Sequence, residues 1–185
     1  MGCAVSTDIL TLTKAPSPVS RLDSFIRRLE AQRSCLNRAV DLVRDMAAPI
    51  LELGLGNGRT YHHLREALPD RQIFVFDRQV AAHPDCIPDP EHLILGDLRE
   101  TLIAVRPRFA HSVALAHMDI GTGDKAESSA LAATVSSLLV PLIRAGGVVV
   151  SEPKLVVSGW SELPLPEEVP AGRYWMYSVG SECGG

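Results

Sequence analysis

Apolar and polar residues alternate along this chain in blocks that predict strands and helices in turn. An apolar run of roughly four to eight residues, bounded by turn residues, is typical of a buried strand. Such runs occur at 49–53, 72–77, 92–97, 112–119 and 148–151. Stretches with apolar residues spaced three and four apart separate most of them and predict amphipathic helices. The alternation therefore predicts an α/β fold with a doubly wound, mostly parallel sheet.

Both ends of this pattern carry additional elements. Ser20 is a suitable N-cap for a helix over 20–46 that precedes the first strand. Its apolar residues begin on one helical face with Leu22, Phe25, Ile26 and Leu29. Residues 173–179 predict a last strand, which we expect to be antiparallel and to expose its aromatic side chains. We expect one domain over 20–180, with a flexible leader at 1–19 and a tail at 181–185.

Prolines exclude one helix and limit two others. Pro84, Pro88 and Pro90 exclude a full helix from the second crossover, which should be short or irregular. We expect a helix over 98–106 to end at Pro107. A helix over 125–143 is expected to be kinked by Pro141 in its last turn.

The composition argues against a nucleic-acid-binding protein and a membrane protein. The 185 residues carry a net charge of -4, which provides no basic surface for nucleic acid. No apolar run approaches the roughly 20 residues that a membrane span requires. The four cysteines are scattered, as is typical of free thiols in a reducing compartment. We therefore expect a cytoplasmic protein that binds neither nucleic acid nor membrane.

The loop after the first strand carries the main chemical signal. Residues 50–60 join an apolar strand to a helix through three alternating glycines, Gly54, Gly56 and Gly58. The dinucleotide fingerprint is different, because Arg59 stands where its third glycine would be. Glu52 precedes the loop, and a carboxylate there would repel a diphosphate but attract a sulfonium and an ammonium group.

Acids also follow the next strands of the predicted sheet. Asp77 ends the second strand, where a carboxylate can accept hydrogen bonds from ribose hydroxyls. Asp97 ends the third strand and is also a suitable N-cap for the helix that follows. Asp119 ends the fourth strand, and His117 should point to the same face of the sheet. These ends of parallel strands define one predicted ligand-binding edge.

An acid followed by G-x-G-x-G at the end of a first strand resembles motif I of the class I S-adenosylmethionine-dependent methyltransferases. The chain also resembles a small bacterial family of such enzymes whose substrates are undefined. This resemblance covers about residues 48–152 and implies a Rossmann-like methyltransferase fold with S-adenosyl-L-methionine as the cofactor. It implies three groups of cofactor-binding residues: Glu52, Gly54, Gly56 and Gly58 at the methionine end, Asp77 at the ribose, and Asp97 with Leu98 at the adenine.

The resemblance also implies the reaction, an in-line transfer of a methyl group to a small-molecule acceptor. Asp119 and His117 are the candidate catalytic bases, with Glu152 third. Asp119 and Glu152 could be compared with the magnesium-binding acids of catechol-type methyltransferases. However, Pro153 stands where an amide ligand would be, so we expect no metal.

Two other functions stay open at this point. A protein that binds S-adenosylmethionine without catalysis would explain the short second crossover and the absence of a predicted last long helix. An NAD-dependent oxidoreductase is opposed by the glycine spacing and by Glu52. A homodimer could supply missing walls of the site, with an interface at the N-terminal helix or at 174–177. The sequence does not identify the methyl acceptor.

Overall fold

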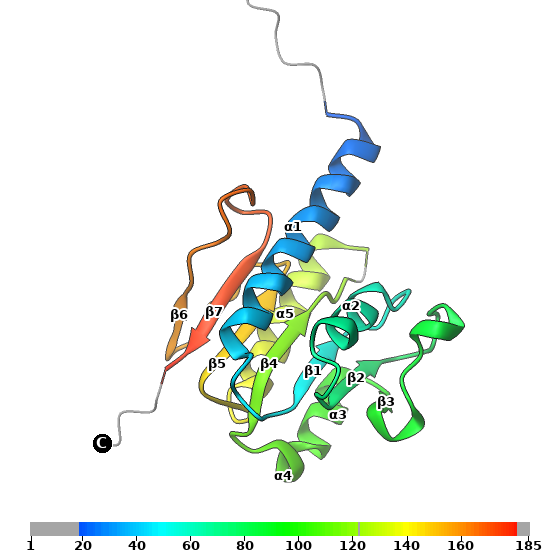
Figure 1. Cartoon of the computed structure of the whole chain (residues 1–185), viewed down its shortest axis with the longest axis vertical. Helices are drawn as coiled ribbons and strands as arrows, with labels where there is room; N and C mark the ends of the chain where they lie inside the picture. Colours follow the sequence, from blue (N-terminus) through cyan, green and yellow to red (C-terminus); the bar gives the residue numbers. More distant parts are fainter. Residues whose placement is uncertain (1–18, 122, 181–185) are drawn as a thin grey trace, which may run out of the picture.

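A seven-stranded sheet in the order β3-β2-β1-β4-β5-β7-β6 organises the fold (Figure 1). The computed structural model describes residues 19–121 and 123–180. Nearly all of the predicted leader and the whole predicted tail therefore lie outside the described residues. Neighbouring strands are parallel from β3 to β5, whereas β7 runs antiparallel to β5 and β6. This confirms the mostly parallel sheet with an antiparallel last strand.

The elements follow the predicted order with few exceptions. The strands are β1 (Ile50–Leu53), β2 (Ile73–Asp77), β3 (Leu93–Leu95), β4 (Val113–Met118), β5 (Ile143–Ser151), β6 (Trp160–Glu162) and β7 (Trp175–Val179). The α-helices are α1 (Arg21–Val43), α2 (Arg59–Ala67), α3 (Leu98–Ala104), α4 (Arg106–Phe109) and α5 (Lys125–Leu139). Two 3₁₀ turns, η1 (Pro84–Cys86) and η2 (Pro90–His92), form the second crossover, which is irregular as its prolines predict.

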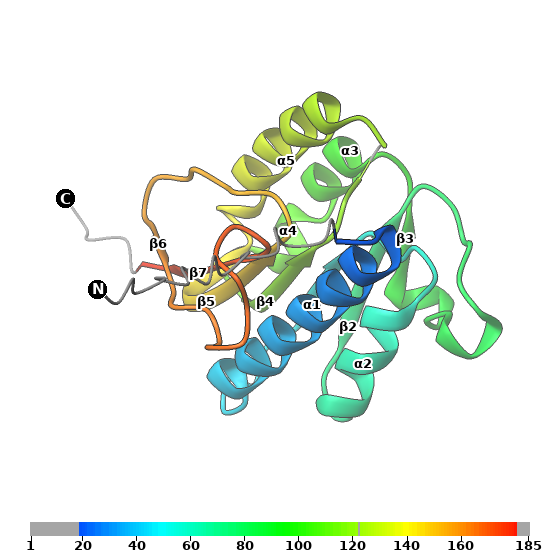
Figure 2. The same ribbon diagram turned by 90° about the horizontal axis from the view of Figure 1, so that it is seen from above.

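Helices cover both faces of the sheet (Figure 2). Helices α1 and α2 pack on one face, and α3, α4 and α5 lie on the other. Because side chains alternate along a strand, Ile50 packs toward α1 and α2 while Leu51 and Leu53 pack toward α3 and α5. By the same alternation Glu52 faces the α1–α2 side, inside an apolar layer. No helix among the described residues is long and apolar enough to cross a membrane.

Two sequence expectations about helix ends are wrong, and one strand was not expected. Helix α5 ends at Leu139, and Ile143 begins β5, because Pro141 cannot continue a helical hydrogen-bond ladder. Pro107 does not stop a helix but lies in the first turn of α4, where a missing N–H costs nothing. Strand β6 was not predicted at all; it has three residues and hydrogen-bonds only to β7 in the sheet.

The last predicted strand is not an exposed aromatic surface. Tyr174 and Tyr177 are 0% and 2% exposed, because β6 covers the edge of β7 and the two core layers cover its faces. The structure therefore contradicts the expectation that 174–177 forms a dimer interface.

Gly58 fixes the start of α2 and packs tightly against the second crossover. Its φ of +83° lies in the left-handed region, and a Cβ added there would lie 2.4 Å from Cys86 Cβ. Gly56 also has a positive φ, +51°, but a Cβ there would meet no atom within 4 Å. An alanine at Gly56 would therefore introduce backbone strain alone, whereas an alanine at Gly58 would introduce both strain and steric overlap.

We predict that Gly58→Ala lowers the free energy of unfolding by about 2–4 kcal/mol, the sum of left-handed strain and overpacking. Gly56→Ala is the matched control and should lose only about 1–2 kcal/mol, because it carries the strain alone. Chemical denaturation of both variants measures the difference. Equal losses would contradict the contact between Gly58 and Cys86.

Candidate functional site

A cleft of about 600 Å³ lies at the carboxyl ends of the parallel strands. Five of the predicted site residues line it: Gly54, Gly56, Asp77, Leu98 and Asp119. The sequence did not predict its other lining residues, which follow β2 and β4 or lie on α5: Arg78, Ile120, Gly121, Glu127 and Leu131. Their only sequence signal is their position just after the predicted strand ends or on the next helix.

The glycine loop is held in place from two sides. A Cβ on Gly54 would lie 2.6 Å from the carbonyl oxygen of Asp119, so only glycine allows the loops after β1 and β4 to approach this closely. Oδ2 of Asp77 accepts hydrogen bonds from the backbone N–H groups of Leu55 (2.8 Å) and Gly56 (3.1 Å). Asp77 thus faces the cleft and also anchors the loop, a structural role that the sequence did not indicate.

Asp97 and Leu98 take different places at the end of β3. Asp97 caps α3 by accepting from the N–H of Arg99, and its carboxylate also accepts from the Arg99 guanidinium at 2.8 and 2.7 Å. These hydrogen bonds hold the pKa of Asp97 well below its usual range. Leu98, 8% exposed, lines the cleft, whereas Asp97 is not among the lining residues.

A buried carboxylate–imidazole pair lies beneath the glycine loop. The sheet register places Glu52 of β1 beside His117 of β4. Both side chains are 0% exposed, and Glu52 Oε2 lies 2.9 Å from His117 Nδ1. The hydroxyl of Thr60, in the first turn of α2, donates to the other oxygen of Glu52. Glu52, which the sequence analysis places at the methionine end of the cofactor, is enclosed in this arrangement and is not among the residues that line the cleft.

The pair continues into a hydrogen-bonded chain that reaches the cleft. His117 Nε2 lies 3.1 Å from the Tyr174 hydroxyl, and Gln32 of α1 donates to Tyr174 at 2.9 Å. The same Gln32 amide donates to Asp119 Oδ2 at 2.8 Å. Arg28, one turn earlier on α1, lies 3.3 Å from both oxygens of Asp119. Side chains from α1, β1, α2 and the segment before β7 thus converge on the end of β4.

Four members of this network were missed by sequence reasoning: Arg28, Gln32, Thr60 and Tyr174. Gln32 has one signal, because it interrupts the apolar stripe of α1 between Leu29 and Leu36. At 4% exposed it needs partners, since a buried amide without hydrogen bonds is costly. Nothing in the sequence pairs it with Tyr174, which lies 142 residues away.

The protonation of His117 follows from its neighbours. Burial lowers the pKa of His117, but the charge and hydrogen bond of Glu52 outweigh burial and leave the pKa above its usual value. Burial raises the pKa of Tyr174 well above 10, so its hydroxyl remains protonated. His117 is enclosed with both ring nitrogens engaged, and the structure therefore does not place it where an acceptor in the cleft could reach it.

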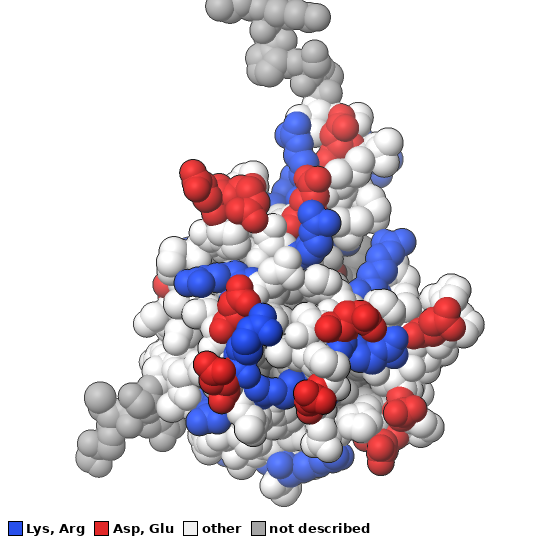
Figure 3. Space-filling model, viewed as in Figure 1, with Lys and Arg blue, Asp and Glu red and all other residues white. Residues whose placement is uncertain are grey.

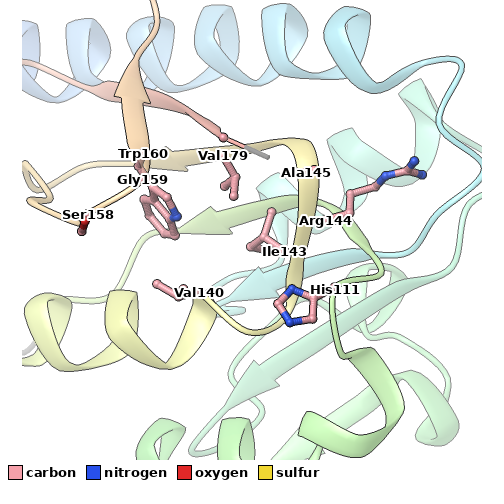
Figure 4. Close-up of a pocket in the computed structure, with 10 residues that line it drawn as sticks. His111, Val140, Ile143, Arg144, Ala145, Ser158, Gly159, Trp160 and Val179 are labelled. Atoms are coloured by element: carbon pink, nitrogen blue, oxygen red, sulfur yellow. The ribbon is translucent and has the colours of Figure 1, made fainter. Parts of the chain in front are cut away.

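A second cavity, of about 500 Å³, lies at the opposite end of the sheet, near the start of β5 (Figure 4). The indole of Trp160 and the side chain of Ile143 face one another across it, and Arg144 points to the other side of β5. None of its lining residues belongs to the glycine loop or follows β1, β2 or β4. We therefore assign the ligand chemistry to the cleft at the carboxyl ends.

No group of three or more His, Cys, Asp or Glu side chains within 19–121 and 123–180 is arranged to hold a metal ion. Asp119, the residue that would be shared with such a site, is instead engaged by Arg28 and Gln32.

We predict that the buried pair makes stability depend on pH. Because the pKa of His117 is raised, the protonated side chain stabilises the fold fully below about pH 6.5. This stabilisation is lost as the pH rises through the raised pKa. His117→Gln should therefore cost about 3 kcal/mol at pH 6, because it leaves Glu52 buried without its partner, and less at alkaline pH. Denaturant unfolding from pH 6 to 9.5 measures this difference.

The control for this measurement is His83→Gln, since the His83 side chain is 68% exposed. That variant should stay within about 0.5 kcal/mol of the parent at every pH. A cost of His117→Gln that does not change with pH would contradict a protonated His117.

The chain resembles solved methyltransferase structures over most of its length. An S-adenosyl-L-methionine methyltransferase from Silicibacter pomeroyi DSS-3 is 45% identical, with a TM-score of 0.83, covering 87% of this chain and 99% of that one. The MycE methyltransferase of the mycinamycin biosynthetic pathway, solved with Mg and S-adenosylhomocysteine, is 16% identical with a TM-score of 0.55. That similarity covers 91% of this chain and 50% of MycE, and it supports the fold alone.

A comparison with curated protein sequences found no match. The family model described as S-adenosyl-L-methionine methyltransferase matches residues 19–179, which include every described helix and strand. This confirms the predicted family, fold and cofactor and removes the oxidoreductase alternative. With its glycine loop, strand-end acids and seven-stranded sheet, the chain belongs to this family of S-adenosyl-L-methionine methyltransferases.

Proposed function

We propose that this S-adenosyl-L-methionine methyltransferase methylates a small-molecule acceptor bound beside Asp119. The observation that carries the proposal is the position of that carboxylate. It lines the cleft, its side chain is 28% exposed, and Arg28 and Gln32 of α1 fix its orientation. A carboxylate fixed at the mouth of a cofactor cleft can orient an O–H or N–H nucleophile.

The cleft residues fit S-adenosylmethionine by their chemistry. The cofactor supplies an activated methyl group on a sulfonium, so the protein chiefly binds, orients and excludes water. Asp77 and Asp119 present carboxylates to a ligand that carries two cationic groups. Leu98, Ile120 and Leu131 offer apolar walls for the adenine ring. We assign the ribose to Asp77 and the adenine to Leu98.

The buried acid has an indirect role in this proposal. Because Glu52 raises the pKa of His117, the protonated imidazole is favoured, and its positive charge offsets the negative charge of the Glu52 carboxylate. The attraction of the cleft for the sulfonium therefore comes mainly from the acids that line it, Asp77, Asp119 and Glu127. We propose that Glu52 and His117 position the glycine loop and that Asp119 alone contacts the acceptor.

Surface charge favours a small acceptor over a nucleic acid. Basic and acidic side chains are interspersed over the face in Figure 3, with no broad patch of one sign. The chain's net charge of -4 would also weaken binding to a polyanion. Cys35 and Cys86 are free thiols, as we propose for a cytoplasmic enzyme.

The first turns of α1 are the place where we propose that a second copy packs. Leu22, Phe25 and Ile26 are 66%, 45% and 45% exposed there. Exposed apolar side chains grouped on one helix are typical of an interaction surface. Light scattering of the purified protein tests this, and a monomer at high concentration would contradict it.

We predict that Asp77→Asn weakens the binding of S-adenosylhomocysteine by about tenfold or more, as expected when a charged hydrogen-bond acceptor is removed. Calorimetric titration measures the change. Asp70→Asn is the matched control, because Asp70 is exposed in the turn between α2 and β2 and lies outside the cleft. Unchanged affinity in Asp77→Asn would exclude Asp77 from the ribose site.

The acceptor class can be tested with methyl-labelled cofactor and a panel of small amines, acids and hydroxyl compounds, with RNA and a protein mixture included. We predict label on a small molecule and a rate about 10²-fold lower in Asp119→Asn. Label found only on RNA or protein would contradict the proposed acceptor. Cofactor binding without label on any acceptor would contradict the proposed transfer.

A further inference from the structure

A groove of about 210 Å³ lies between α1 and α2, apart from the cofactor cleft. Leu29 and Leu36 of α1 provide apolar surface, and the long polar side chains of Arg33, Arg59 and His63 line it as well. The groove shares no lining residue with the cofactor cleft. It is therefore a feature separate from the cofactor cleft.

The charged side chains that line this groove are basic. None of its described lining residues is acidic. Within the described part of the chain, neither Arg33 nor Arg59 forms an ion pair, whereas Arg28 on α1 and Arg44 just after α1 are each paired with an aspartate. Two guanidinium groups beside an apolar surface are suited to a ligand that carries an anionic group.

The pKa of His63 depends on the same positive charge. Its Nε2 lies 2.7 Å from Oδ1 of Asn37, which places the ring against α1. Burial lowers the pKa of His63, and the nearby charges of Arg33 and His62 lower it further. An anion bound between Arg33 and Arg59 would offset these cations, so the ring can report on occupancy.

We propose that the α1–α2 groove binds a small molecule that joins an apolar group to a carboxylate or phosphate. The size is suitable, since a cavity of roughly 150 Å³ accommodates benzene. The apolar group would lie on Leu29 and Leu36, and the anionic group would accept hydrogen bonds from Arg33 and Arg59.

The groove is connected to the cofactor side through two shared side chains. Gln32 and Thr60 line the groove. Gln32 also donates to Asp119, and Thr60 also donates to Glu52. A ligand in the groove would thus contact the side chains that position both acids. This proposal does not depend on which acceptor the enzyme methylates.

Benzoate is the probe for this site, and benzamide is its uncharged control. We expect benzoate, but not benzamide, to shift the NMR resonances of the His63 ring and to raise the pKa of His63. The double variant Arg33→Gln, Arg59→Gln should bind benzoate at least tenfold more weakly. Arg27→Gln is the matched control, because Arg27 is exposed on α1 and lies outside the groove, and its affinity should stay within twofold of the parent.

Three outcomes would overturn the proposal: equal effects of benzoate and benzamide, unchanged benzoate affinity in the folded double variant, or loss of the benzoate site when S-adenosylhomocysteine saturates the cleft. The last result would assign the anion to the cofactor's own site. Benzoate binding that persists with saturating S-adenosylhomocysteine, whether its affinity rises or falls modestly, supports a separate groove.

Discussion

The structure depends on the pairing of Glu52 with His117 in the layer between the sheet and helices α1 and α2. A carboxylate that is 0% exposed must be compensated by hydrogen bonds and an opposite charge. Thr60 and His117 supply both. Because Thr60 lies on α2 and His117 on β4, the same two contacts fix the helix and the neighbouring strand that flank the glycine loop. The pair therefore helps to fix the position of the glycine loop.

The network beyond the pair explains why α1 belongs to the site. Tyr174 and Gln32 connect His117 to Asp119, because Tyr174 contacts His117 and the Gln32 amide donates to both Tyr174 and Asp119. Removing any one member would leave another buried polar group without its partner. The orientation of Asp119 therefore depends on the packing of a helix that precedes the first strand in the sequence.

Much of the fold followed from local patterns in the sequence. The alternation of apolar strands and helices, the glycine spacing and the acids at the ends of β1, β2 and β4 were sufficient to predict the sheet, the family and the cofactor. Helix ends at prolines were harder, because Pro107 starts one helix while Pro141 lies beyond the end of another. Strand β6 was missed because its three residues pair only with β7, and that pairing is not a local property.

The site was predicted only in part, because local patterns mark the residues near turns but not the contacts between distant parts of the chain. Gly54, Gly56, Asp77, Leu98 and Asp119 are close to turns that the sequence marks, and they do line the cleft. Glu52 and His117 were identified as residues of interest, but their enclosure depends on helices packed over them. Gln32 and Tyr174 depend on contacts across the whole chain, and no periodicity brings them together.

The close contact between Gly58 and Cys86 has a mechanical consequence. The irregular crossover that contains Cys86 packs directly on the residue from which α2 begins, and no layer of side chains lies between them. A change in the crossover, such as alkylation of the partly exposed Cys86 thiol or a proteolytic cut beside it, would remove a support of the loop. Damage to this exposed crossover would therefore disturb the glycine loop where it joins α2.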